Sequence, residues 1–103
     1  MVRAYVGIGA NLGEPRAQVA AAFEALDALP CTRVIARSSL YRSAPVGVGP
    51  QPDFINAVAA VDTTLSADAL LEALLAIEVR HGRERPHPGA ARTLDLDLLL
   101  YGT

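Results

Sequence analysis

The chain has 103 residues, of which 51% are apolar and 19% charged, and its formal net charge is −2. These values predict one globular domain, exclude a disordered chain, and give no electrostatic footprint for nucleic acid or an acidic membrane. The single cysteine cannot form an internal disulfide, the N-terminal apolar run is too short for a signal peptide, and no stretch is long enough to span a bilayer. We therefore expect a cytoplasmic protein.

The first half of the chain predicts a strand, a helix and a second strand. Residues 3–9 (RAYVGIG) contain good strand formers and lead into a turn with glycine. Apolar side chains recur at helical spacing over residues 16–29, with Pro15 suited to the first turn and Pro30 ending the helix. Residues 32–43 (TRVIARSSLYRS) alternate weakly and predict one continuous second strand.

The second half predicts a strand, a helix and a last strand, separated by loops. Residues 44–53 contain three Pro and two Gly and predict an exposed loop. A helix from an N-cap at Ser66 to about His81 carries an apolar stripe. The stripe consists of Leu70, Leu71, Leu74, Leu75 and Ile77. The third strand is expected at 54–64, a second loop rich in Gly and Pro at 82–91, and the last strand at 92–102.

This βαββαβ order predicts an α+β fold, the ferredoxin-like sandwich, in which a four-stranded, mainly antiparallel sheet carries two helices on one face. Residues 1–103 contain no internal linker, repeat or low-complexity tract, so we expect one domain. Tyr41 and Tyr101 are expected in the core of the sheet. Because this architecture hosts many functions, the function must come from particular side chains.

Two acids interrupt the apolar last strand, Asp95 and Asp97. Side chains alternate along a strand, so the two carboxylates share a face, with Cα atoms about 6.6 Å apart, while Leu94, Leu96, Leu98 and Leu100 are expected on the other face. Carboxylates this close repel, and a pair of Mg²⁺ ions would relieve the repulsion. The alternative is a wet sheet face with two solvated acids.

Three arginines favour the metal interpretation of this acid pair. Arg83, Arg85 and Arg92 bracket the loop that leads directly into the last strand. Guanidinium groups that hold phosphates would therefore lie beside acids that hold metal, as in phosphoryl transfer.

The stretch 82–102 (GRERPHPGAARTLDLDLLLYG) resembles the G-R…R-T-L-D-L-D signature of the 6-hydroxymethyl-7,8-dihydropterin pyrophosphokinases of folate biosynthesis. Further segments are similar to the same family in the same order, so that the resemblance covers essentially the whole chain. They are YVGIGANLG at 5–13, SSLYRSAPVG at 38–47, QPDFINAV at 51–58 and IEVRHGR at 77–83.

The resemblance implies that ATP gives its two terminal phosphates as a unit to the hydroxymethyl oxygen of a reduced pterin, and that AMP leaves. It implies that Asp95 and Asp97 hold two Mg²⁺ ions. Arg83 and Arg92 would neutralise the charge on the transferred group, and Arg85 would contact the phosphates. Arg83 and Arg85 could instead belong to an ordinary solvated loop, and the two aspartates to a solvated sheet face.

The resemblance also implies a pterin site made by Ser43, Ala44, Val46, Phe54 and Asn56. Phe54 and Asn56 share a face of the third strand, and an aromatic ring beside an amide suits a flat heterocycle. The family usually has Tyr at position 54, so Phe54 keeps the stacking surface and loses a hydroxyl. Alternatively, Asn56 is a polar residue at a strand edge.

Glu78 is an acid on the leucine stripe of the second helix, an unusual position for a charge. The resemblance implies a place near ATP and the metals. A salt bridge to an arginine at the helix end is an equally open interpretation.

The chain departs from the family at its end. Family members continue with a segment that carries a Pro-His motif, an Arg and an aromatic residue, and the loop before Arg92 lacks the Trp common in relatives. We expect a complete folded core that is monomeric and, as a chain truncated relative to the family, weak or inactive. The alternative function is a non-catalytic ferredoxin-like binding or regulatory module that needs no metal. An RNA-binding sheet is disfavoured by the acidic balance.

Overall fold

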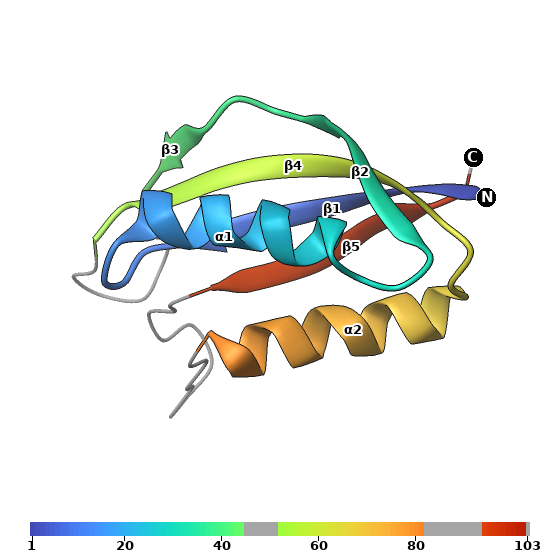
Figure 1. The fold of residues 1–103 in the computed structure, drawn as a ribbon. Helices are drawn as coiled ribbons and strands as arrows, with labels where there is room; N and C mark the ends of the chain where they lie inside the picture. Colours follow the sequence, from blue (N-terminus) through green and yellow to red (C-terminus); the bar gives the residue numbers. More distant parts are fainter. Residues whose placement is uncertain (45–51, 82–93, 103) are drawn as a thin grey trace.

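The chain folds into two layers, a sheet and a pair of helices packed on one of its faces (Figure 1). This computed structural model describes residues 1–44, 52–81 and 94–102. Within them the elements run in the order β1 (Val2–Ala10), α1 (Pro15–Asp27), β2 (Thr32–Arg37), β3 (Tyr41–Ser43), β4 (Phe54–Thr63), α2 (Ala67–Arg80) and β5 (Asp95–Tyr101). No helix in these three ranges is long and apolar enough to cross a membrane.

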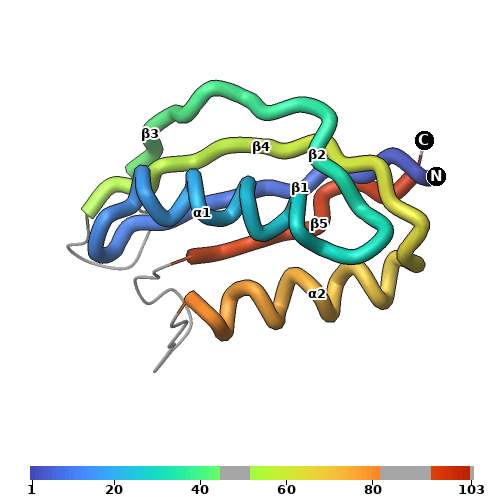
Figure 2. Tube along the Cα trace, viewed as in Figure 1, coloured from blue at the N-terminus to red at the C-terminus, as the bar shows by residue number. Residues whose placement is uncertain are grey.

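The sheet has the strand order β2-β4-β1-β5, β3 also pairs with β4, and every pairing is antiparallel. The predicted α+β, ferredoxin-like arrangement is therefore confirmed. The central strand β1 lies between β4 and β5 along its length, which the tube trace makes easy to follow (Figure 2). Strand β5 lies at the edge of the sheet, and this position matters for the acids that it carries.

The sheet differs from the prediction in its second strand, which is interrupted and raises the number of strands from four to five. Ser38 explains the break. Its N–H donates to the carbonyl oxygen of Val58 (2.9 Å), and its Oγ accepts from the N–H of Val58 (2.7 Å). A side-chain oxygen thus continues the pairing with β4 while the backbone turns between β2 and β3.

The core lies between the sheet and the helices. Ala4, Val6 and Ile8 of β1 are buried on this side, as alternation along a strand requires. They join side chains from both helices, namely Val19, Ala22, Phe23 and Leu26 of α1 and Leu70, Leu74 and Ile77 of α2. Tyr101 packs against this core as predicted, and its hydroxyl donates to the carbonyl oxygen of Leu65 (2.6 Å).

The buried stripe of α2 differs from the predicted one. Leu71 and Leu75 are 44% and 46% exposed, so their assignment to the core was wrong. Each helical residue advances about 100° around the axis, which carries these two leucines away from the line through Leu70 and Leu74. The same line continues to Glu78, which is buried. The predicted N-cap is confirmed, because Ser66 Oγ accepts from the N–H of Ala69 (3.1 Å).

Candidate active site

The face of the sheet opposite the helices has a floor of bare backbone on β1. Gly9 pairs with Asn56 of β4 on one side and with Asp95 of β5 on the other. Gly7 pairs in the same way with Val58 and Asp97. Directly paired residues point to one face of a sheet, so the amide and the acids emerge on either side of the glycines. Two strand spacings of about 4.8 Å place Asn56 and Asp95 roughly 10 Å apart.

These residues line a pocket of about 340 Å³. A volume of this size suits a small flat molecule. Its lining comes from four strands and consists of Gly7, Ile8, Gly9, Tyr41, Ser43, Phe54, Asn56, Ala57, Val58, Asp95, Asp97 and Leu99. Of the predicted site residues, the structure therefore brings together Ser43, Phe54, Asn56, Asp95 and Asp97.

Gly9 is a site residue that the sequence did not single out as such. A Cβ at this position would lie 3.2 Å from Oδ1 of Asn56 and 3.9 Å from Cδ1 of Phe54. At Gly7 the nearest atoms belong to the Leu99 side chain, at 3.4 Å. Glycine within a strand often marks the close approach of a ligand, and this signal was present in the sequence.

The amide of Asn56 is oriented by β3. Its Nδ2 donates to Ser43 Oγ (2.7 Å) and, at 3.5 Å, approaches the carbonyl oxygen of Tyr41. Its Oδ1 faces Gly9 on the pocket floor. Tyr41 is 52% exposed and lines the pocket, so its predicted place in the core was wrong. Residues 41 and 43 face the pocket because β3 pairs in register with Asn56 and Phe54.

The acid pair alternates with buried leucines as predicted. Leu94 and Leu96 are buried, whereas Asp95 is half-buried and Asp97 is exposed on the pocket side. The alternation then fails, because the pairing shifts between Tyr5 and Val6 at a β-bulge. Leu100 consequently pairs with Tyr5 and is 61% exposed, so the expectation that it fills the core face was wrong.

The donor set of the pocket suits Mg²⁺ that arrives with phosphates. In the described part of the chain, no group of three or more His, Cys, Asp or Glu residues could hold a metal ion. Two carboxylate groups on one face are nevertheless the kind of oxygen donors that Mg²⁺ takes, with water and substrate phosphates completing its shell. Asp95 and Asp97 therefore fit such an ion.

Glu78 is buried on the stripe of α2 where the sequence places it, but its partner was not predicted. Its side chain is 1% exposed, and its Oε2 accepts from the backbone N–H of Leu96 (2.7 Å), the residue between the two aspartates. It does not line the pocket. The carboxylate thus reaches the acid-bearing strand from α2.

The remaining predicted residues fall outside the pocket or outside the described ranges. Ala44 is exposed directly after β3 and does not line the pocket. Val46, Arg83, Arg85 and Arg92 lie outside the described residues.

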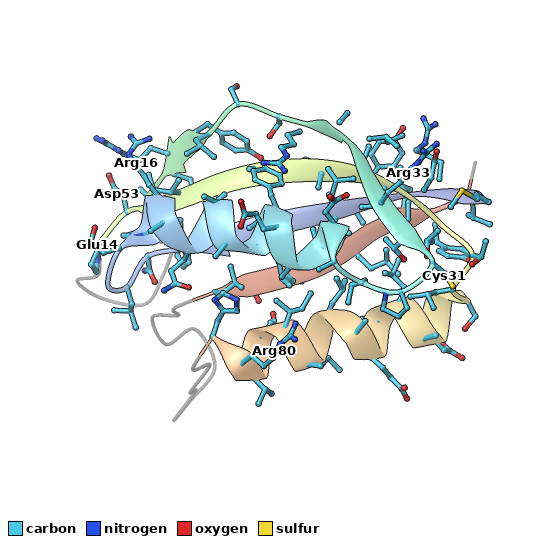
Figure 3. All side chains as sticks on the ribbon, in the orientation of Figure 1. Glu14, Arg16, Cys31, Arg33, Asp53 and Arg80 are labelled. Carbon is cyan, nitrogen blue, oxygen red and sulfur yellow. The ribbon has the colours of Figure 1, made fainter. Side chains whose placement is uncertain are left out.

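Two other features of the surface lie apart from the pocket. Glu14, Arg16 and Asp53 gather near the N-terminal end of α1 (Figure 3) and line a second hollow with mixed charge. The free, exposed Cys31 lies at the opposite end of the molecule from Asp53 (Figure 3), which places it far from this end of the sheet.

Comparison with known proteins decides the family. The family model for 7,8-dihydro-6-hydroxymethylpterin-pyrophosphokinase (HPPK) matches residues 5–103. The chain belongs to the HPPK family.

Individual HPPK relatives support this membership. The chain is 53% identical over 100 residues to the 2-amino-4-hydroxy-6-hydroxymethyldihydropteridine pyrophosphokinase of Pseudomonas aeruginosa, an alignment covering 97% of this chain and 62% of the relative. It is 51% identical to the protein of the same name from Pseudomonas putida, with 97% and 82% covered. It is also 35% identical to the folic acid synthesis protein fol1 of Schizosaccharomyces pombe, with 95% and 13% covered. The chain thus spans less than two thirds of the P. aeruginosa relative.

Proposed function

We propose that this chain forms the core of an ATP-dependent pyrophosphokinase of folate synthesis. The hydroxyl oxygen of 6-hydroxymethyl-7,8-dihydropterin bonds to the β-phosphorus of ATP, the bond from that phosphorus to the α,β-bridging oxygen breaks, and AMP leaves while the hydroxyl loses its proton. The observation that carries the proposal is the alignment of Asn56, Gly9 and Asp95 across three neighbouring strands, in a chain of the HPPK family.

The β4 side of the pocket would hold the pterin. The ring would lie over Gly9, where no side chain intrudes, and stack against Phe54. Asn56, held by Ser43, presents an amide that can match the donor and acceptor edges of the ring. The hydroxymethyl group would then extend across β1 toward β5.

The β5 side would hold the triphosphate. Asp95 and Asp97 would bind two Mg²⁺ ions, which when bound screen the phosphate charge during transfer. Arg83 and Arg92 would neutralise the charge that builds on the transferred group, and Arg85 would contact the phosphates. One arginine in such a role can contribute a factor of about 10³–10⁵ in rate.

The proposal extends to the residues after β3, the oligomeric state and the location of the enzyme. We propose that Ala44 and Val46 contribute backbone contacts to the pterin, and that the enzyme is a monomer that acts in the cytoplasm, where ATP is available. Light scattering on the purified chain would test the monomer directly, and a dimer mass would contradict it.

Isothermal titration with α,β-methylene-ATP, which the enzyme cannot cleave at the α,β bridge, tests the proposal. Binding should require Mg²⁺ and should be abolished by the double substitution Asp95→Ala and Asp97→Ala. A cooperative urea denaturation curve of this variant serves as the control that it still folds. Binding of equal strength without metal would overturn the assignment. A wild-type chain without any Mg²⁺-dependent thermal shift would favour the non-catalytic binding module.

A further inference from the structure

The edge strand β5 has an unusual partner for its backbone. An edge strand leaves one row of N–H and C=O groups without a neighbouring strand. Leu96 pairs with Ile8 of β1, and its N–H bonds instead to Oε2 of Glu78 at 2.7 Å. The bond therefore fastens the middle of the Asp-Leu-Asp segment to helix α2.

The acid that makes this bond lies on a stripe where an apolar side chain is expected. Glu78 is 1% exposed and lies on the stripe that includes Leu74 and Ile77, which are equally buried. A buried carboxylate is unfavourable unless hydrogen bonds compensate it, and an apolar side chain of similar volume often packs as well or better. A charge-assisted bond to a backbone N–H is short and strong, which favours a directional role for this carboxylate.

We infer that Glu78 is a positioning residue that fixes the peptide of Leu96 and so aims Asp95 and Asp97 into the pocket. The inference rests on the proposed function, because it assumes that this acid pair binds metal. Side chains alternate along a strand, so holding one peptide sets the direction of both flanking carboxylates. Without this bond, the edge strand would lose the contact that holds it to α2 at Leu96, between the two like-charged side chains.

Two substitutions separate positioning from other roles of Glu78. Glu78→Met keeps the approximate volume and removes the acceptor, whereas Glu78→Gln keeps an acceptor oxygen and removes the charge. Leu74→Met is the matched control, because it alters the same buried stripe one turn away from the bond.

The first readout is the amide proton shift of Leu96 in a ¹H–¹⁵N spectrum of the chain without metal. A short bond to a carboxylate moves this resonance downfield. We expect Glu78→Met to move it upfield and Glu78→Gln to retain most of the downfield shift. Leu74→Met should leave it unchanged.

The second readout is the affinity for Mn²⁺ with α,β-methylene-ATP by titration calorimetry. Removing a residue that orients metal ligands commonly weakens binding 10–100-fold. We expect Glu78→Met to lower this affinity about tenfold or more while it retains pterin binding and its unfolding temperature. In Glu78→Gln the affinity should lie within about threefold of the wild-type value.

Each outcome decides the inference. Unchanged affinity in Glu78→Met, although the Leu96 amide has shifted, would overturn it. An equal loss of affinity in Glu78→Gln with a retained amide shift would also overturn it, because the charge itself would then act on nucleotide or metal. If Glu78→Met does not fold, the affinity and amide shift of Glu78→Gln decide alone. If instead Asp95→Ala with Asp97→Ala leaves affinity intact, the proposed function fails, and not merely the role of Glu78.

Discussion

The two faces of β1 and β5 serve opposite purposes within the same strands. On the helix side, Val6 and Ile8 alternate with residues of the open face and are buried. On the open side, Gly7 and Gly9 leave space, and β5 carries its two acids. The opposite face of β5 carries buried leucines. The difference shows that a period of two residues lets one strand stabilise the fold and form the floor of a pocket at once.

The largest effect expected from this comparison is on stability. Ile8→Ala removes from the core a side chain that is 3% exposed and belongs to the residue between the two glycines of the pocket floor. The lost contacts and the cavity should lower the free energy of unfolding by about 2–5 kcal/mol, measured by urea denaturation. At temperatures where the variant stays folded, nucleotide affinity should remain near that of the wild type. A variant that loses affinity but not stability would contradict the division between the faces.

Gly9→Ala, at the next residue, should lower ligand affinity and leave stability nearly unchanged. A methyl group there meets Oδ1 of Asn56 at 3.2 Å and occupies the floor of the pocket. We expect pterin affinity to fall about tenfold, equivalent to about 1.4 kcal/mol, in a fluorescence titration, while stability changes little. Gly7→Ala, at the other glycine of the floor, should lower pterin affinity less, because the nearest atoms to its methyl group belong to the Leu99 side chain at 3.4 Å and not to Asn56. Wild-type pterin affinity in Gly9→Ala would contradict the proposal that the pterin ring lies over Gly9.

Ser43→Ala tests the support of the pocket wall and should have a smaller effect. The substitution removes the 2.7 Å bond that orients the Asn56 amide. One such bond contributes about 1 kcal/mol, so pterin affinity should fall about threefold to tenfold. Ser39→Ala, an exposed serine between β2 and β3, serves as the control. Equal affinity of the two variants would show that the amide needs no support from β3.

The smallest effect is expected at the Arg3–Asp62 ion pair, which joins β1 to β4 away from the pocket at 2.7 Å. The hydrogen bond from the Arg3 guanidinium holds the pKa of Asp62 below its usual value of 3.8. A lowered pKa means that any stabilisation is present above pH 3.8 and is lost as the pH falls through the lowered value. Asp62→Asn should therefore shift the urea midpoint slightly at pH 7 and not at strongly acidic pH. A larger shift in acid would contradict this sign.

The sequence predicted the features that depend on local periodicity. Alternation predicted the faces on which Leu94, Leu96 and the acid pair lie. Helical spacing together with the Ser66 cap predicted the position of α2. The misplacement of Leu71 and Leu75 came from the phase of the helical period, whereas the other failures came from contacts distant in the chain. The bulge that exposes Leu100 depends on pairing with β1, and the exposure of Tyr41 depends on β3 pairing with β4. The partner of Glu78 lies 18 residues further along the chain, beyond the reach of any periodic pattern.

The most direct test of the central claim is paramagnetic broadening by Mn²⁺ bound with α,β-methylene-ATP. In a ¹H–¹⁵N spectrum, the account predicts that broadening centres on the amides of residues 95–97 and on Gly7 and Gly9, which pair with the two aspartates. The double substitution Asp95→Ala and Asp97→Ala should abolish it. Broadening centred elsewhere, or unchanged in the double variant, would contradict the claim that this acid pair carries the nucleotide's metal.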